Sequence, residues 1–386
     1  MLKFCLGSAT PSIESYYNVE KKKYGLVELN ERFGGIKLPE IEIIDTRQVA
    51  AAKKGKVILS PQLKAGIENA VTNNKQVILF QNRRGYSPFL ICGTCGFIPN
   101  CNNCDVTLTL HKFSNKLHCH YCGSSYPKLI TCPACGTVNW IEKNFGTEKI
   151  EEELENKFPS YKIARMDMDS VRGKTAHDSL IKLFEQHKID ILAGTQMVVK
   201  GLDFENVSLV GVLDADGLLS FADFRANERA FQLMEQVSGR AGRKGEQGKV
   251  MIQAAKITHP VLLFVQQHDF KRFYDFEIEK RKNFYYPPFS RVIKIILKHK
   301  IKEVVYEAAD RLGDALKKDM NDFVVGPAAP VVNRIRSLYL MEILLKLPKD
   351  VSMLKQYKKV IANHFNLLHA EKKFRSVTLI ADVDPM

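Results

Sequence analysis

The sequence has 386 residues, of which 45% are hydrophobic and 26% charged, and its formal net charge is +14. These proportions are typical of globular chains, and no apolar run approaches the roughly 18 residues that a bilayer requires, which excludes disordered and membrane-spanning classes. No signal peptide opens the sequence, so we expect a soluble cytoplasmic protein of two or three domains with a polyanionic partner, whose nine cysteines are thiols or metal ligands.

The first residues predict the end of a sheet followed by a helix. Residues 3–7 have the apolar pattern of a short buried strand, in which Cys5 would be an inert core thiol. Thr10 and the proline after it predict the cap and first turn of a helix that continues towards Tyr17. Because a domain rarely begins with an inner strand, we expect the chain to be the later part of a longer protein, with Met1 an internal methionine.

Residues 31–56 have the Gly, Pro and Lys content of a connector, apart from an extended segment at 41–44. Beyond it, helices alternate with apolar strands, which predicts a parallel α/β sheet with ligand-binding loops at the strand ends. The predicted strands are 76–80, 162–166, 189–194, 207–213 and 249–254, and the predicted helices begin near 60 and span 148–158, 176–187 and 227–239.

A change of pattern follows a long charged helix at 258–282, where two tyrosines and two prolines at 285–288 mark a domain boundary. The order beyond it is β-α-β-β-α-β, which predicts a ferredoxin-like α+β domain. Its strands are expected at 291–298, 323–326, 332–347 and 376–381, and its helices at 303–318 and 351–368. Residues 257–386 carry 23 basic and 15 acidic side chains, so much of the positive charge lies here.

Eight of the nine cysteines form four C-x-x-C pairs, and two such pairs complete the tetrahedral shell that Zn²⁺ prefers. The alternating residues 106–110 and the returning residues 116–118 predict a hairpin that brings Cys104 beside Cys119. The sequence therefore predicts two nested structural sites: an outer one of Cys92, Cys95, Cys132 and Cys135 (zinc 1) and an inner one of Cys101, Cys104, Cys119 and Cys122 (zinc 2). The alternatives are disulfides, redox chemistry, or ligation by His111, His118 or His120.

Residues 236–243 read Gln-Val-Ser-Gly-Arg-Ala-Gly-Arg and end a helix-like stretch. Arg240 and Arg243 would stand one turn apart on one face, and each glycine would cost about 1 kcal/mol inside a helix. That cost indicates a function, because an Arg fork suits the charge spread over a transferring phosphoryl group, as in arginine fingers. The alternative is a solvated basic face, which would not need both glycines.

Polar residues also follow two predicted strands. Backbone amides after Gly194 and Thr195 could hold phosphate, with Gln196 and Lys200 hydrogen-bonding it. Asp214 and Asp216, at the next strand end, are either a carboxylate site or a turn.

A phosphate-binding loop of the Walker A type is missing from the sequence. Residues 173–175 read Gly-Lys-Thr, but Met168 stands where the motif needs another glycine. No other segment supplies the motif, so the arginine fingers lack the phosphate-binding half that they should serve.

These motifs resemble the C-terminal half of the primosomal protein N′ family of superfamily 2 DNA helicases, over nearly all of the sequence. Residues 7–12 resemble helicase motif III, residues 81–86 motif IV, residues 194–203 motif V and residues 236–243 motif VI. Residues 213–216 and 223–229 also match the family's pattern, although Ala222 stands where the family usually has proline. Four cysteine pairs inserted in the second motor lobe separate this family from other helicases.

The resemblance implies two RecA-like lobes that close on ATP and Mg²⁺ and move single-stranded DNA 3′ to 5′ during primosome assembly and replication restart. It implies that Arg240 and Arg243 reach the γ-phosphate, with Gln236 in the same motif. It also implies that ATP and DNA are coupled by Thr10, Gly194, Thr195, Gln196, Lys200, Gly201 and Asp203. The zinc module would contribute to DNA unwinding and partner contacts. The C-terminal domain would bind forked DNA, single-strand-binding protein and other primosome proteins, in a cytoplasmic, nucleoid-associated location and with no membrane partner.

On this interpretation the chain has five parts. Residues 1–30 are the C-terminal remnant of lobe 1, 31–56 the connector, and 57–91 with 136–256 the parallel sheet of lobe 2. Residues 92–135 are the zinc-binding insertion, and 257–386 the C-terminal domain that binds DNA and partners.

The family's Walker A loop, acidic Walker B motif and N-terminal DNA-binding region are absent from these residues, so we expect this chain alone not to hydrolyse ATP. Two other functions compete with a helicase. One is a non-catalytic zinc-ribbon adaptor that binds nucleic acid, and the other is a thiol oxidoreductase. A reading frame that continues upstream through a P-loop would favour the helicase, and fewer than two zinc ions per chain would favour the oxidoreductase.

Overall fold

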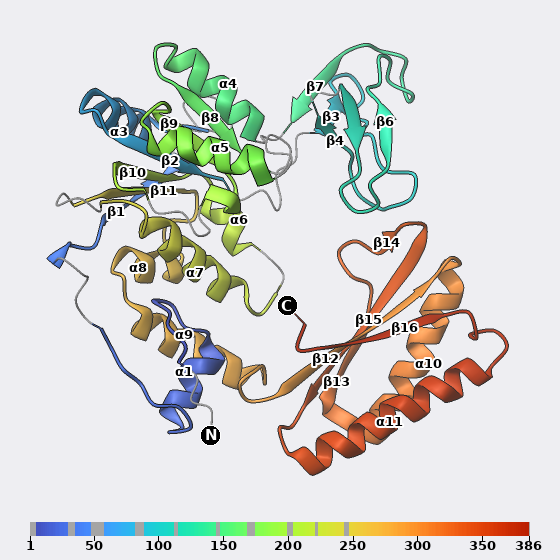
Figure 1. The fold of residues 1–386 in the computed structure, drawn as a ribbon. Coiled ribbons are helices and arrows are strands. Elements are labelled where there is room, and N and C mark those ends of the chain that lie inside the picture. Colours follow the sequence, from blue (N-terminus) through green and yellow to red (C-terminus); the bar gives the residue numbers. More distant parts are fainter. Residues whose placement is uncertain are drawn as a thin grey trace. The chain divides into compact units, whose positions relative to one another are not determined.

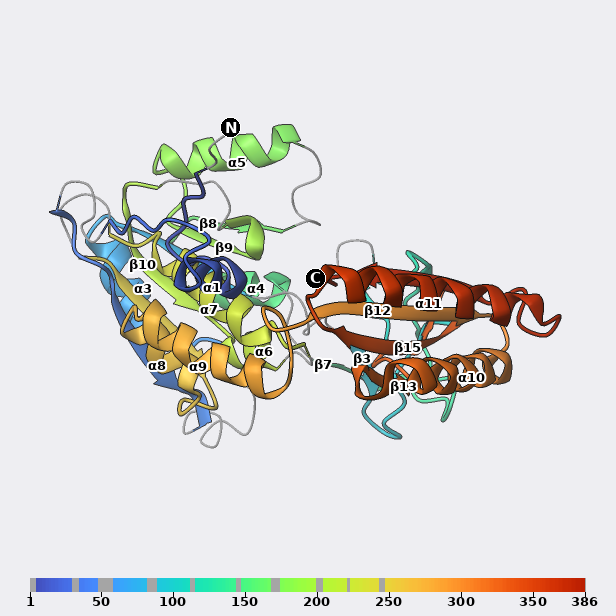
Figure 2. The ribbon, with the colours of Figure 1, turned by 90° about the horizontal axis from the view of Figure 1, so that it is seen from below.

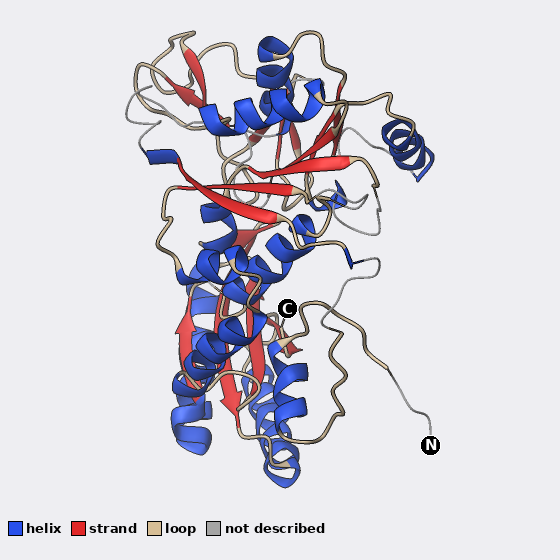
Figure 3. Ribbon diagram, turned by 90° about the vertical axis from the view of Figure 1, so that its left-hand side faces the viewer, coloured by secondary structure: helices blue, strands red, loops and turns tan. Residues whose placement is uncertain are grey.

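The computed structural model describes residues 5–29, 35–47, 58–81, 89–111, 115–143, 147–167, 174–198, 204–220, 223–242 and 247–385. The chain forms two compact units (Figures 1 and 3). The first unit is Met1–Ser87 with Phe145–Ile278, and the second is Pro88–Asn144 with Glu279–Met386. In the described ranges, every helix is too short or too polar to cross a bilayer.

A six-stranded sheet in the order β1-β11-β10-β2-β9-β8 forms the centre of the first unit (Figure 1). Every pairing in it is parallel, as the alternation of helices and strands predicts. The strands are β1 (Glu40–Asp45), β2 (Gln76–Phe80), β8 (Ile163–Met166), β9 (Ile191–Gly194), β10 (Val207–Val212) and β11 (Lys249–Ala254).

Both faces of this sheet are buried, which explains why its central strands are mostly apolar. In β2, Val77 and Leu79 join a core with α3 (Pro61–Thr72) and α4 (Thr147–Lys157). The alternate residues Ile78 and Phe80 join a second core. To that core contribute α1 (Ile13–Glu20), α5 (Lys174–Glu185), α6 (Ala215–Leu219), α7 (Ala226–Ser238), α8 (Pro260–Gln266) and α9 (Phe270–Asn283).

Two predicted segments differ in the structure. The extended segment expected inside a connector is β1, a strand of the sheet that pairs with β11 over six residue pairs. Ile41 and Ile44 of β1 are buried in different cores, so the strand is held by apolar packing on both faces of the sheet. The single helix expected at 258–282 is two helices, because His268 has a φ of +52° and interrupts the helical path between α8 and α9.

The start of the chain also differs from the prediction. Cys5 is exposed and Leu6 is 79% exposed, so the described part of residues 3–7 is not a buried strand and Cys5 is not a core thiol. An apolar strand is buried only where it pairs within a sheet, and among the described residues the edge strands of this sheet are β1 and β8. The helix cap is Ser12 rather than Thr10, since the Ser12 side chain accepts the Ser15 N–H at 3.1 Å.

The C-terminal part of the second unit has the predicted β-α-β-β-α-β order, with one short extra strand. Its antiparallel sheet runs β13-β15-β12-β16, and both helices pack with β12 and β15 in one core (Figure 2). The elements are β12 (Arg291–His299), α10 (Lys302–Met320), η3 (Asn321–Phe323), β13 (Val324–Ala328), β14 (Arg334–Ile335), β15 (Leu338–Leu347), α11 (Val351–Ala370) and β16 (Thr378–Val383).

The cysteine-rich segment contributes two small sheets to the same unit. β3 (Phe89–Cys92) pairs antiparallel with β7 (Trp140–Lys143). This pairing joins the first and last strands of the cysteine-rich segment. Between them, β4 (Thr109–His111), β5 (Lys116–His118) and β6 (Ser125–Pro127) form a three-stranded sheet. In the division into two compact units, the cysteine-rich segment groups with Glu279–Met386, and α8 with most of α9 groups with the six-stranded sheet.

Candidate zinc centres and motor residues

Three of the four C-x-x-C pairs fold into the same tight turn, here called a knuckle, meaning the pair and the two residues after it. A glycine follows the second cysteine, and Gly96, Gly123 and Gly136 have φ values of +77°, +80° and +73°. L side chains rarely adopt this left-handed conformation, so glycine suits the position. Each glycine N–H donates to the carbonyl oxygen of the first cysteine of its pair, at 2.8–2.9 Å.

A second bond in each of these knuckles reaches sulfur. The backbone N–H of the residue after the glycine bonds Sγ of the second cysteine, from Phe97 to Cys95, from Ser124 to Cys122 and from Thr137 to Cys135. Both bonds come from residues within the turn itself. Each of the three knuckles thus presents two sulfur atoms to one point without help from the rest of the chain.

The knuckles combine in the nested pairing that the sequence predicts. Cys92, Cys95, Cys132 and Cys135 form the outer site, and Cys101, Cys104, Cys119 and Cys122 form the inner site. Within each site all four Sγ atoms lie within 4.8 Å of one another. The pairing of β4 with β5 places Thr109 opposite His118, which carries Cys104 towards Cys119 as expected for the hairpin.

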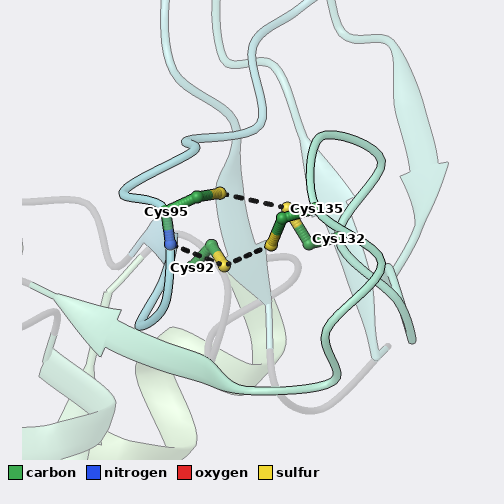
Figure 4. Close-up of side chains that lie close together, drawn as sticks. All are labelled: Cys92, Cys95, Cys132 and Cys135. Atoms are coloured by element: carbon green, nitrogen blue, oxygen red, sulfur yellow. Dashed lines mark hydrogen bonds between the residues drawn. The ribbon is translucent and has the colours of Figure 1, made fainter.

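The sulfur geometry fits zinc. In the outer site, Cys92 Sγ lies 3.6 Å from Cys135 Sγ, and Cys95 Sγ lies 3.6 Å from Cys132 Sγ (Figure 4). A tetrahedral Zn–S₄ centre with Zn–S bonds of about 2.3 Å has sulfur atoms about 3.8 Å apart. All nine cysteines are free thiols. The described ligand atoms of both sites are cysteine sulfurs, and the side chain of His111 lies outside the described residues.

The inner site holds its thiols in different environments. Burial raises the pKa of the Cys119 thiol to about 12. Hydrogen bonding with the Ser124 hydroxyl, 3.1 Å away, lowers the pKa of the Cys122 thiol to about 6. A metal ion bound by these thiols would replace their protons. The two clusters are consistent with two zinc sites.

The predicted phosphate loop begins at the end of β9. A Cβ at Gly194 would lie 2.4 Å from the Met166 carbonyl oxygen and from Val198 Cγ1, so only glycine fits between β9 and β8. Thr195 is buried and donates its N–H to Met166 O at 3.2 Å, and Gln196 begins the turn η2 (Gln196–Val198). Lys200, Gly201 and Asp203 lie outside the described residues, as do residues 82–86 of the segment that resembles motif IV.

The segment 236–243 is not a continuous helix. α7 ends at Ser238 with Gly239 as its C-cap, and Gly242 has a φ of +70° and donates its N–H to Val207 O at 2.9 Å. The glycines therefore lie beyond the helix, where they carry no helix-interior cost. Gln236 is exposed on the last turn of α7 and Arg240 is half-buried just after it, whereas Arg243 lies outside the described residues.

Asp214 and Asp216 hold backbone in place rather than forming a paired carboxylate site. Asp214 caps α6 by accepting the Gly217 N–H at 3.0 Å. Asp216 accepts the N–H groups of Ala255 and Lys256 at 2.6 and 3.0 Å, directly after β11. The turn interpretation of these residues is the one that the hydrogen bonds support.

One buried carboxylate escaped the sequence reasoning. Glu228 on α7 is 4% exposed and accepts the Ile13 N–H at the start of α1, at 2.9 Å. One turn further along α7, the Gln232 side chain donates to the Thr10 carbonyl oxygen at 3.3 Å. The segment that resembles motif III is thus attached to the helix that leads to Gln236 and Arg240. Glu228 lies inside the family-like segment 223–229, which was the only signal for it.

Comparison with known proteins agrees with these features. The profile of the PriA DNA helicase Cys-rich region domain matches residues 101–127, that of the Primosomal protein N C-terminal domain matches 282–386, and that of the Helicase conserved C-terminal domain matches 135–245. The Replication restart protein PriA of Bacillus subtilis is 36% identical over 98% of this chain and 47% of its own length. The chain belongs to the PriA family.

Other PriA proteins match in the same way. The Treponema pallidum protein is 38% identical over 89% of this chain and 52% of its own length, and the Synechocystis protein is 36% identical over 99% and 46%. The chain therefore spans about half the length of the PriA proteins that it matches.

Proposed function

We propose that this chain is the second motor lobe, zinc module and C-terminal domain of an ATP-dependent 3′–5′ DNA helicase that assembles the primosome and restarts stalled replication forks. The observation that carries the proposal is the match to PriA proteins over nearly the whole chain, together with the attachment of Thr10 to the helix that leads to Arg240. In the proposal, a lobe that is not part of this chain supplies the Walker A and Walker B residues.

The proposed roles of the motor residues rest on the helicase motifs that their segments resemble. ATP and Mg²⁺, when bound between two lobes, would supply the phosphoryl group whose transfer drives movement. Arg240 and Arg243 would stabilise its charge as arginine fingers. Gln236 on the last turn of α7, and the loop after Gly194 with Thr195, Gln196, Lys200, Gly201 and Asp203, would transmit closure to DNA. The contact of Glu228 with the start of α1 would keep α7 in register with the segment around Thr10.

The two cysteine sites would each hold one structural Zn²⁺, because four sulfur ligands leave no position for a reacting water. The C-terminal domain, with its excess of basic residues, would bind forked and single-stranded DNA. Single-strand-binding protein and other primosome proteins would be its protein partners. Phosphate contacts by lysine and arginine make such binding strongly salt-dependent.

The first test uses the chain by itself. Purified residues 1–386 should bind two zinc ions and forked DNA, with affinity that falls steeply with salt, and should show no DNA-stimulated ATP hydrolysis. Hydrolysis by this chain alone would contradict the division of the motor between two lobes.

The second test supplies the other lobe. Joining the N-terminal half of the Bacillus subtilis PriA protein to this chain should restore DNA-stimulated hydrolysis. In that protein Arg243→Ala should abolish turnover while fork binding stays within about twofold, because an arginine finger acts on the transferring phosphoryl group and not on DNA. Retained turnover would remove the arginine-finger role, and a joined protein that binds DNA and folds but never hydrolyses ATP would favour a non-catalytic adaptor.

A further inference from the structure

The fourth knuckle, Cys101–Cys104, is built differently from the other three. Asp105 follows its second cysteine where the others have glycine, and Asp105 is not in the left-handed conformation. The Asp105 N–H therefore does not return to the first cysteine, and donates instead to Arg334 O at 2.9 Å. Residue 334 belongs to the C-terminal domain, so the bond that closes the other knuckles locally is made here across more than two hundred residues of sequence.

The bond to sulfur is supplied from the same place. The Arg336 N–H lies 3.2 Å from Cys104 Sγ and takes the part that Phe97, Ser124 and Thr137 take in their own knuckles. The Ser337 N–H donates to Asn103 O at 2.6 Å. Cys104 is fully buried, so its sulfur depends on a protein donor rather than on water.

The donor is a tight hairpin, formed by β14, Arg336, Ser337 and the first residues of β15, here called the β14–β15 hairpin. Ile335 pairs with Leu338 across a two-residue turn, and both turn residues have positive φ, +52° and +61°, although neither is glycine. This conformation directs the N–H groups of both turn residues at the knuckle.

Side chains add to the same contact. The Arg334 Nε lies 2.9 Å from an Asp105 carboxylate oxygen, and the Ser337 hydroxyl lies 3.1 Å from Asn103 Oδ1. Ile335 packs on the small apolar core that contains Cys101, Cys104 and Cys119. The contact thus combines backbone bonds, an ion pair and apolar packing at one knuckle.

We propose that the β14–β15 hairpin is an outer shell of the inner zinc site, so that zinc binding and the docking of this hairpin stabilise each other. Zn²⁺ with four thiolates carries a net charge of −2, and a backbone N–H aimed at one sulfur stabilises that charge. Linkage makes the coupling reciprocal: whatever factor docking adds to zinc affinity, zinc adds to docking. The proposal rests on the proposed zinc occupancy of the inner site. The outer site provides an internal comparison, because both of its knuckles are closed by hydrogen bonds from their own residues.

The test compares two substitutions at one position in the 386-residue chain. Arg336→Pro removes the N–H and cannot adopt the left-handed turn, whereas Arg336→Gly keeps both and removes only the side chain. Zinc transfer to a chromogenic chelator is followed for each. Arg336→Pro should weaken one of two zinc equivalents by about 10- to 100-fold, which is typical of losing an outer-shell partner, and leave the other unchanged. Arg336→Gly should resemble the parent chain.

A rescue distinguishes the proposed role from general damage to the C-terminal domain. Asp105→Gly gives the fourth knuckle the C-x-x-C-Gly form, which lets it close from its own residues. In that background Arg336→Pro should have a much smaller effect on zinc release, although any damage to the C-terminal domain would be the same. An undiminished effect in the Asp105→Gly background would overturn the proposal.

The unmodified chain provides a measurement that needs no substitution. When chelator removes zinc, the backbone amides of Arg336 and Ser337 should lose protection from hydrogen exchange together with the inner knuckles, while amides of α10 and of the rest of β15 keep theirs. Protection at these two amides that persists after both zinc ions have left would overturn the coupling. A purified chain without zinc would instead overturn the zinc assignment itself.

Discussion

In the six-stranded lobe, apolar side chains from both faces of the sheet form two extensive cores, whereas the cysteine-rich segment has short strands and one small core. Three of the seven fully buried residues of that small core are cysteines of the inner site. The lobe can therefore fold by burying apolar surface, and the segment has too little of it. One chain thus uses two sources of stability, apolar burial in the lobe and zinc binding in the cysteine-rich segment. We expect different conditions to unfold the two regions.

Zinc removal should produce the largest difference between the two regions. Binding of structural zinc is worth on the order of 10 kcal/mol or more in small zinc domains, so chelation should unfold residues 89–143 and leave the sheet of the lobe intact. Hydrogen exchange read by mass spectrometry would show protection lost in β3 to β7 and kept in β2, β9 and β10. Simultaneous loss in both regions would contradict separate sources of stability.

A cavity made in the apolar core of the lobe should destabilise the lobe without releasing zinc. Phe231 is 1% exposed and stacks on Phe273 with ring centroids 4.2 Å apart, so Phe231→Ala should lower the free energy of unfolding of the lobe by about 3–5 kcal/mol. Urea denaturation would measure the loss, and both zinc ions should remain bound. Phe284→Ala removes the same atoms from a side chain that is 65% exposed and should change stability by less than about 0.5 kcal/mol. Equal effects of the two changes would be inconsistent with a packed core at Phe231.

A polar contact inside the lobe should matter less than the core. Glu228→Ala leaves the buried Ile13 N–H without its acceptor and should cost about 1–3 kcal/mol, whereas Glu228→Gln keeps an oxygen there and should cost less. The measurement is hydrogen exchange at the first turn of α1 together with urea denaturation. If Gln and Ala were equally damaging, charge rather than the bond to Ile13 would be the important property.

A single helix cap should give the smallest change. The Ser60 side chain accepts the Leu63 N–H at 3.2 Å at the start of α3, so Ser60→Ala should destabilise the lobe by about 1 kcal/mol. Ser179→Ala is the matched control, because that hydroxyl donates to the Thr175 carbonyl oxygen within α5 and caps nothing. Thermal denaturation of both variants would show whether the lost stability comes from the helix cap or from the loss of any hydroxyl group.

Much of the fold and the grouping of the cysteines could be predicted from sequence because the signals are local. Short apolar runs identify strands such as β2 and β10, and the β4–β5 hairpin lies within a few residues of Cys104 and Cys119. Short-range patterns of this kind act before any tertiary contact forms. The glycines after three of the cysteine pairs and the aspartate after the fourth are equally local, but the prediction from sequence did not include them.

The helix predicted at 227–239 corresponds to α7, but the path of the chain beyond it could not be predicted. Gly242 bonds Val207 at the start of β10, and that tertiary bond decides where the chain turns. Propensity is a weak prior that such contacts override. The same holds for the extended segment at 41–44, which only the free edge of β11 turned into a strand of the sheet.

Sequence patterns were enough to infer the alternation of helices and strands, the two sets of four cysteines and the resemblance to a helicase lobe, because each depends on residues close together in the chain. Only the folded chain shows that Cys5 is exposed, that Glu228 holds the start of α1, and that Arg336 completes the knuckle of Cys104. The partners of Glu228 and of Arg336 lie more than two hundred residues away in the sequence. A backbone N–H carries no side-chain signature of the group it will bond, so only the folded chain reveals it.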